Sequence, residues 1–371
     1  MTTTSQHDRH HALDQLRAIA MLAGVLFHAS LAHSSLMQPF WPGAMGATSP
    51  VVDALAWLSH LVRMPLFFLV SGYFTASLLD RRGMEGLFRQ RLRRILVPFL
   101  VAWPVLTLSF SFGLSWAAEN VHASNSVLSF LRSASESDIR AMPLTLGHLW
   151  FLPYILLFSV LVWVGRTLAL GWMLDAAMKK RSAIVIALLP LVLVAPFAMT
   201  SAPHPAPESL FPQFWAIGLY GPFFALGYGL FGRLSWLERL PLGWFSAGVV
   251  VAYSVFFWRL FAGPSEDLWP RAAIAIAISQ AVVAAWGTIL ALSVGIKFLN
   301  RPSRTLSYLA RGSYTTYLVH LPLVIALQIS LLGIEAPLLI KFFIVVSGSL
   351  AGSLLFYEFI VRRTFLRQWI G

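Results

Sequence analysis

The sequence predicts an all-α, polytopic membrane protein. Hydrophobic residues make up 58% of its 371 positions and charged residues only 11%, and the mean hydropathy is +0.73. A water-soluble domain of this length does not normally reach such values, whereas a bilayer-spanning helix needs a run of about 20 apolar residues. Cysteine is absent, which excludes disulfide bonds, thiolate metal sites and a cysteine nucleophile.

Ten apolar runs are long enough to cross a bilayer as helices. They cover residues 13–35, 52–79, 95–116, 145–165, 183–200, 211–232, 242–262, 271–296, 312–332 and 337–360. No soluble domain, internal repeat or low-complexity tract separates them. We therefore expect residues 1–371 to form a single membrane-embedded domain.

The distribution of Lys and Arg predicts cytoplasmic N- and C-termini. With ten spans, one side of the membrane receives 21 of the 27 basic residues and the other side only four, namely Arg132, Arg140, Arg271 and Lys341. The positive-inside rule makes the basic side cytoplasmic. Membrane orientation also explains most of the net charge of +12, so no nucleic-acid partner is expected. An alternative is a cleaved signal peptide with residues 18–27 as its apolar core, which would leave nine spans.

Arg17 and His28 lie inside the first apolar run, in the segment LDQLRAIAMLAGVLFHAS. Eleven positions of α-helix correspond to about three turns and roughly 16 Å of rise, so both side chains share one helix face. Ionisable groups inside a bilayer are costly and usually face a cavity. This pair therefore predicts a functional site, with His28 near the middle of the membrane and Arg17 near one surface.

Arg63 is expected at the depth of His28. It lies eleven residues into the second run, which is antiparallel to the first. A guanidinium and an imidazole that converge in the membrane would suit an anionic or developing negative charge. The alternative is that Arg63 pairs with Asp53, bonds to backbone carbonyls or extends to the membrane surface.

Further along the second run, Pro65 is expected to loosen the helix, and the pair Ser71 and Gly72 would permit a break before Tyr73. The small residues there also suit close helix packing. The cytoplasmic cluster RRGMEGLFRQRLRR places Arg91 and Arg94 on adjacent helical turns, where they would bind phosphate oxygens or simply contact anionic lipid.

Three more polar sites have two interpretations each. His148 and Trp150, in GHLWFLPY, suit an interfacial aromatic belt or a surface that stacks against sugar rings. His320, in the middle of the ninth run, is a packing residue or a catalytic one. Glu358 is expected to form a local ion pair with Arg362 rather than to donate a proton.

No sequence motif predicts a metal or nucleotide site. HExxH, carboxylate clusters, Walker A and strand-flanked GxGxxG patterns do not occur, so we expect no metal and no permanently bound cofactor.

Taken in order, these segments resemble the acyltransferase 3 family of membrane acyltransferases, and within it the glucans biosynthesis protein C branch. The resemblance covers nearly the whole chain. It rests on the Arg, ten residues, His pattern of Arg17 and His28, on RMPLFFLVSGYF (63–74), on the RxxR of Arg91 and Arg94, and on HLWFLPY (148–154), YLVHLP (317–322) and YEFIVR (357–362).

The resemblance implies a ten-span enzyme of the bacterial inner membrane. It would transfer an acyl group, expected to be succinyl, from cytoplasmic acyl-coenzyme A to a hydroxyl of a periplasmic glucan. The partners are then the coenzyme thioester, the glucan and the lipid bilayer; a homo-oligomer is left open. Relatives also use acetyl donors.

Within that reaction we expect His28 to act as general base and Arg63 to stabilise the oxyanion or to bind the succinyl carboxylate. Arg17, Arg91 and Arg94 would bind acyl-coenzyme A, and Asp14 would orient Arg17. Supporting roles fall to Ser71, Tyr73, His320 and Glu358, and acceptor-side roles to His148 and Trp150. Two other classes of protein stay open: a secondary carrier of organic anions, and a non-catalytic scaffold for glucan synthesis.

Overall fold

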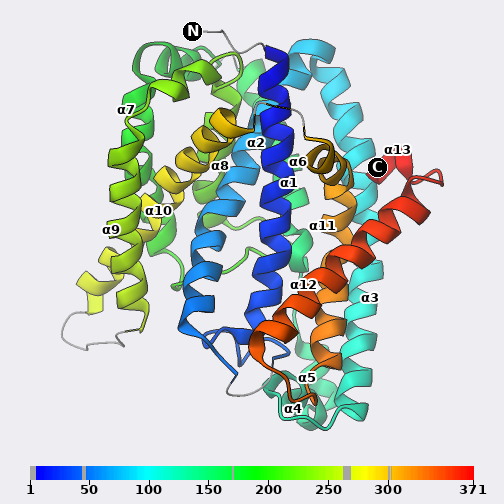
Figure 1. Cartoon of the computed structure of the whole chain (residues 1–371). Coiled ribbons are helices and arrows are strands. Elements are labelled where there is room, and N and C mark those ends of the chain that lie inside the picture. Colours follow the sequence, from blue (N-terminus) through cyan, green and yellow to red (C-terminus); the bar gives the residue numbers. More distant parts are fainter. Residues whose placement is uncertain (1–5, 44–46, 169–170, 262–268, 300, 302) are drawn as a thin grey trace. The chain divides into compact units, whose positions relative to one another are not determined.

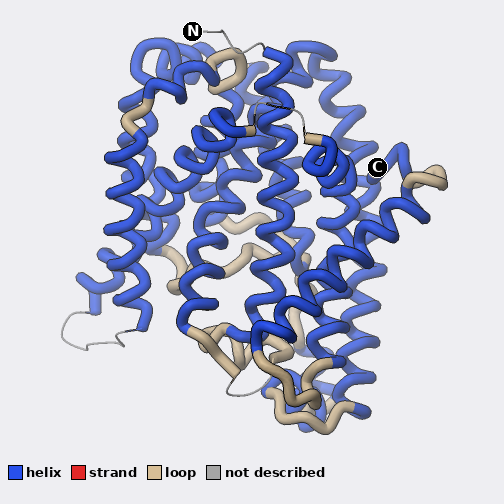
Figure 2. The backbone as a smooth tube through the Cα atoms, in the orientation of Figure 1, coloured by secondary structure: helices blue, strands red, loops and turns tan. Residues whose placement is uncertain are grey.

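The computed structural model describes the chain except residues 1–5, 44–46, 169–170, 262–268, 300 and 302. The described residues are 81% helical and contain no strand, which confirms the predicted all-α class (Figures 1 and 2). The longer helices are α1 (Gln6–Ser30), α2 (Pro50–Arg91), α3 (Val97–Asn120), α6 (Phe151–Thr167), α7 (Gly171–Ala198), α8 (Phe214–Gly229), α9 (Leu242–Phe261), α10 (Trp269–Phe298), α11 (Arg304–Ser330) and α12 (Leu338–Leu355).

Shorter helical elements connect them. These are the 3₁₀ segments η1 (Leu31–His33), η3 (Gly147–Trp150) and η4 (Leu234–Arg239), the π-helical segments η2 (Leu92–Leu96) and η6 (Phe356–Val361), and the helices α4 (Ser126–Ser133), α5 (Glu136–Ala141) and α13 (Arg367–Ile370).

Six helical stretches of the described chain are long and apolar enough to span a membrane. They are His11–His33, Pro50–Asn120, Gly147–Thr167, Leu242–Phe261, Ala273–Phe298 and Leu338–Val361. Pro50–Asn120 includes two of the predicted runs in one helical stretch of 71 residues. Helices outside these six stretches are shorter, as in Ile184–Ala198, or more polar, as in α11 with its Arg, Tyr, Thr and Gln residues. The chain is thus a multi-pass membrane protein, while the count of ten spans and their orientation stay predictions.

Helix α2 runs without a break through Pro65, Ser71 and Gly72, so the break that these small residues would permit before Tyr73 does not occur. The irregular residue within α2 is Gly83, with φ 64° and ψ −171°. Glycine suits this position because a positive φ is costly for residues that carry a Cβ. The direction of the chain therefore changes at the basic cluster instead of at Ser71.

Contacts divide the chain into two compact units, each built from three separate segments. Unit 1 contains residues 1–20, 60–92 and 150–307, and unit 2 contains residues 21–59, 93–149 and 308–371. In unit 1, α10 packs against α9 and α7, and α8 packs against α7 and α6. Its core is aromatic: Phe68, Tyr73, Tyr154 and Tyr220 are almost completely buried.

Two glycines permit a very close approach of α2 and α8 within unit 1. A Cβ on Gly72 would lie 2.0 Å from the carbonyl oxygen of Phe224, and a Cβ on Gly227 would lie 1.8 Å from that of Leu69. Small residues at such a crossing allow backbone-to-backbone packing in membrane helices. Of the two functions that the sequence suggested for Gly72, packing is therefore the one observed.

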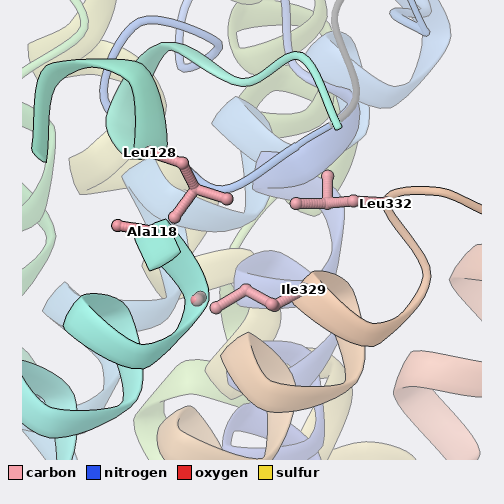
Figure 3. Packing of buried hydrophobic residues seen from close by; sticks show 5 residues of the cluster. Ala118, Leu128, Ile329 and Leu332 are labelled. Carbon is pink, nitrogen blue, oxygen red and sulfur yellow. The ribbon is translucent and has the colours of Figure 1, made fainter. Parts of the chain in front are cut away.

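In unit 2, a small apolar cluster joins α3, α4 and the end of α11. Its members are Ala117, Ala118, Leu128, Ile329 and Leu332 (Figure 3). Asn125 caps α4 by accepting a hydrogen bond from the backbone N–H of Leu128 at 3.0 Å, and its amide donates to the carbonyl of Gly43 at 2.7 Å. This contact fixes the loop that carries Trp41.

Candidate active site

His28 lies near the C-terminal end of α1, between an indole and a second imidazole. Its ring stacks on Trp41 with centroids 6.0 Å apart and an interplanar angle of 20°. On another side, the ring of His320 lies 5.2 Å away. His28 is partly exposed, whereas His320 is 3% exposed. All three residues belong to unit 2, so the structure joins a residue of the first predicted span to one of the ninth.

Gln328 holds Trp41 in this position. The indole Nε1 donates to Gln328 Oε1 at 2.8 Å, and Gln328 Nε2 donates to the carbonyl of Ala29 at 3.0 Å. Carbonyls in the last turn of a helix lack intrahelical partners, which makes Ala29 a natural acceptor. Neither Gln328 nor Trp41 is among the site residues expected from the sequence. The available signal was the side-chain amide of Gln328 within the predicted span 312–332, because such a group needs hydrogen-bond partners in a membrane.

His148 and His320 are held together by backbone carbonyls of α11. Their ring centroids lie 5.4 Å apart. His148 Nε2 lies 3.1 Å from the carbonyl of Tyr317 and 3.3 Å from that of Leu318, and the Tyr317 hydroxyl donates to the carbonyl of His148 at 2.7 Å. His148 is 7% exposed. It faces α11 instead of an open surface where a sugar ring would stack.

Pro322 explains why a carbonyl of α11 is available to His148. Proline within a helix has no N–H to donate to the carbonyl four residues earlier, which here is that of Leu318. His148 approaches this same carbonyl. The YLVHLP segment therefore provides both His320 and the acceptor that fixes His148.

Arg63 lies in unit 1, next to a polar cluster that sequence analysis did not find. It is close enough to His60 and Tyr220 to act on both electrostatically. His60 Nε2 donates to the carbonyl of His204 at 3.0 Å, and the two imidazole centroids are 4.4 Å apart. Because Arg63 and His28 belong to different units, their convergence stays a prediction.

His204 comes from the proline-rich connector between α7 and α8. It is 1% exposed, its backbone N–H donates to Gln280 Oε1 at 3.3 Å, and its Nε2 lies 3.4 Å from the Tyr220 hydroxyl. Burial lowers the pKa of His204 to about 4. The imidazole is therefore neutral at physiological pH.

Asp53, the alternative partner for Arg63, is occupied by serines in unit 2. Its carboxylate accepts hydrogen bonds from the Ser34 hydroxyl, from the Ser35 hydroxyl at 2.8 Å and from the Ser35 backbone N–H at 3.2 Å. This carboxylate is completely buried. Its contacts stabilise the segment that joins η1 to α2.

The three arginines expected to bind acyl-coenzyme A have unequal surroundings. Arg17 forms an ion pair with Asp14 at 3.4 Å, with both side chains about two-fifths exposed, as their spacing on α1 suggests. Arg91 is 8% exposed, and its three guanidinium nitrogens donate to Ser159, Gln90 and Thr75. Arg94 donates to the carbonyl of Gly371 at 2.5 Å.

The remaining predicted residues have mainly structural contacts. Trp150 is 4% exposed and lies against Phe68 and Tyr220, and Tyr73 is 1% exposed. The carbonyl of Ser71 accepts a hydrogen bond from the Thr75 hydroxyl at 2.7 Å.

Glu358 pairs with Arg362 at 2.5 Å, the local ion pair that its position suggested, and also accepts a hydrogen bond from the Tyr308 hydroxyl at 3.2 Å. Within the described ranges, no group of three or more His, Asp or Glu side chains is arranged to hold a metal ion.

Comparison with known proteins agrees with the resemblance of the motifs. The profile of the acyltransferase 3 family, described as an acyltransferase domain, matches residues 10–358. Proteins named glucans biosynthesis protein C from Salmonella typhi and Shigella dysenteriae are both 27% identical to the chain, over 327 and 335 residues, and each alignment covers 85% of the chain and 82% of the relative. No solved structure matches.

Proposed function

Because the chain belongs to the acyltransferase 3 family, we propose that it is a transmembrane O-acyltransferase that moves an acyl group from cytoplasmic acyl-coenzyme A to a hydroxyl of a periplasmic glucan. The acyl group is succinyl and the location is the bacterial inner membrane. The observation that carries this proposal is the partly exposed His28 imidazole, which lies beside Trp41 and His320 in an apolar helical protein.

In the proposed reaction, His28 is the general base. A sugar hydroxyl is a poor nucleophile at neutral pH, so His28 takes its proton as the oxygen attacks the thioester carbonyl. The C–S bond then breaks, the coenzyme leaves as a thiolate and His28 returns the proton to it. One ester is formed for each thioester consumed, and no oxidant or reductant is needed.

Arg63 stabilises negative charge in this proposal. It has two candidate targets: the tetrahedral oxyanion, or the free carboxylate of a succinyl group held by a bidentate pair. The neighbouring His60 and Tyr220 add polar groups to the same part of unit 1.

Acyl-coenzyme A enters from the cytoplasmic side. Arg17, whose side chain is about two-fifths exposed and paired with Asp14, is the best placed of the proposed phosphate ligands. A phosphate at Arg91 would have to replace hydrogen bonds to Ser159 and Thr75, which carries a desolvation cost. Arg94 would have to leave the carbonyl of Gly371.

The test is release of free coenzyme A from succinyl-coenzyme A by membranes that contain the protein, with and without periplasmic glucan. We expect release only with glucan, and we expect His28→Gln to lower it about 10²- to 10⁴-fold at equal protein level. His122→Gln, in the exposed segment after α3, is the matched control and should keep full activity. Unchanged turnover in His28→Gln would remove His28 from the base role.

The same membranes separate the other two classes of protein. A carrier of organic anions would move labelled succinate into vesicles without consuming the thioester. A scaffold would support glucan modification equally well with His28→Gln, while deletion of the whole protein would abolish it. Either result would reject the acyltransferase.

A further inference from the structure

The hydrogen bonds of His320 fix which of its nitrogens carries the proton. Its Nδ1 lies 2.9 Å from the carbonyl of Thr316 and 2.9 Å from that of Tyr317, both on its own helix. Carbonyl oxygens only accept, so Nδ1 must be the N–H of the neutral ring. Nε2, on the ring edge away from this backbone, is therefore the lone-pair nitrogen.

The same reasoning fixes the tautomer of His148. Its Nε2 approaches the carbonyls of Tyr317 and Leu318, so Nε2 carries the hydrogen in the neutral ring. The reciprocal bond from the Tyr317 hydroxyl to the His148 carbonyl fixes η3 against α11. His148 thus meets the ring of His320 edge-on, at 86°, and restricts its rotation.

His28 is the third member of this row of imidazoles. Its ring centroid lies 5.2 Å from that of His320, at an interplanar angle of 51°. Trp41 covers another side of His28 and is itself held by Gln328. The group beside His28 is thus an imidazole whose proton position is determined by backbone carbonyls.

We infer that His320 and His148 are positioning residues for the acyl transfer: His320 offers the lone pair of its Nε2 to the neighbouring His28 ring as that ring takes up a proton, and His148 holds His320 in place. This inference rests on the proposed function of His28. With one His28 nitrogen kept as donor towards His320, the other keeps its lone pair for the sugar hydroxyl. When His28 takes up the proton, its N–H towards His320 becomes a stronger donor, and the hydrogen bond stabilises the imidazolium.

In this proposal His148 orients the catalytic base His28 instead of binding the glucan acceptor. The two roles predict different kinetics. A residue that binds glucan affects KM for glucan, whereas a residue that orients the base affects kcat and leaves KM unchanged.

The experiment measures coenzyme A release from succinyl-coenzyme A with periplasmic glucan, per amount of folded protein, for paired variants. His320→Asn keeps an amide donor near Nδ1 but has no acceptor near Nε2, whereas the longer side chain of His320→Gln places an amide oxygen near Nε2. We expect His320→Asn to lower kcat about 10- to 10²-fold with KM for glucan unchanged, and His320→Gln to recover most of the loss.

His148 provides a second, independent pair. His148→Gln retains a donor for the carbonyls of α11 and should keep most of the activity, whereas His148→Leu should lower kcat. If the His320 variants do not yield folded protein, the comparison of His148→Gln with His148→Leu tests the inference by itself. In the background of His28→Gln, His320→Asn should cause no further loss, because both act through one group.

Three results would overturn the inference: equal activity of His320→Asn and wild type, equal loss in the Asn and Gln variants of His320, or a rise in KM for glucan at constant kcat in His148→Leu. In each of these cases wild type remains active and His28→Gln inactive, so the proposed function stands. Absence of coenzyme A release by wild type would instead reject the proposed function, and the inference with it.

Discussion

Burial of His204 should make the stability of unit 1 depend on pH. Its pKa is lowered to about 4 by burial, against 6.5 for the exposed side chain. Folding therefore favours the neutral form, so the stabilisation is complete above pH 6.5 and is lost as the pH falls towards 4. By pH 5 the loss is about 2 kcal/mol.

This pH dependence can be measured as the melting temperature of the detergent-solubilised protein at a series of pH values between about 7.5 and 5. Wild type should lose thermal stability as the pH falls, and His204→Asn, which keeps the backbone bond to Gln280, should lose less. Equal slopes in the two proteins would mean that His204 does not titrate on unfolding.

At the same scale, Gln328 should matter for activity through Trp41. Gln328→Leu removes the acceptor of the indole N–H and the donor to Ala29. A buried donor without an acceptor costs about 1 to 3 kcal/mol, so Trp41 should leave its position over His28. We expect a slower coenzyme A release and a change in Trp fluorescence. Gln368→Leu, an exposed glutamine near the C-terminal end, is the control; equal effects of the two would contradict this prediction.

At the scale of helices, the crossing of α2 and α8 depends on the absence of a Cβ. In Gly72→Ala or Gly227→Ala, the new atom would overlap a backbone carbonyl, which cannot move like a flexible side chain. Overpacking typically costs about 1 to 3 kcal/mol, and more where backbone must shift. We expect little folded protein by size-exclusion chromatography.

Gly165→Ala in α6 is the matched control for these variants. A Cβ at this position has open space, and alanine is favoured over glycine within a helix by about 0.5 to 1 kcal/mol. The control should fold as well as wild type or better. Normal melting of Gly72→Ala would show that the two helices can separate at no cost.

Pro322 links the geometry of α11 to its histidines. Pro322→Ala restores an N–H that can donate to the carbonyl of Leu318, the group that His148 approaches. We expect a more regular helix but a lower kcat, by about 10-fold, because His148 loses one of its two acceptors. Pro104→Ala, within α3, is the control. A kcat equal to that of wild type would mean that the carbonyl of Tyr317 is sufficient.

At the scale of the whole molecule, the distribution of basic residues predicts that both termini are cytoplasmic and that the segment 117–144 is external. The natural absence of cysteine makes this easy to test, because a single introduced thiol is unique in the chain. Ser137→Cys and Thr364→Cys both place it at exposed positions. In intact spheroplasts, a membrane-impermeant maleimide should label Ser137→Cys and not Thr364→Cys. The opposite pattern would invert the topology.

The amino-acid sequence alone is enough to predict the all-α class, the membrane location and the family. These follow from composition, from apolar runs and from local motifs such as Arg17 to His28, all of which are read within one helix. The local ion pairs of Asp14 with Arg17 and of Glu358 with Arg362 follow in the same way, because helical spacing alone brings such residues together.

The neighbours of His28, in contrast, could be identified only from the folded chain. Its contacts with Trp41 and His320, and the bond from Gln328 to Ala29, join residues up to about 300 positions apart. Helical periodicity states which face a residue occupies but not which helix packs against that face. The buried state of Arg91 was hidden for the same reason: a basic cluster has the same sequence whether its guanidinium meets solvent or, as here, the hydroxyls of Ser159 and Thr75.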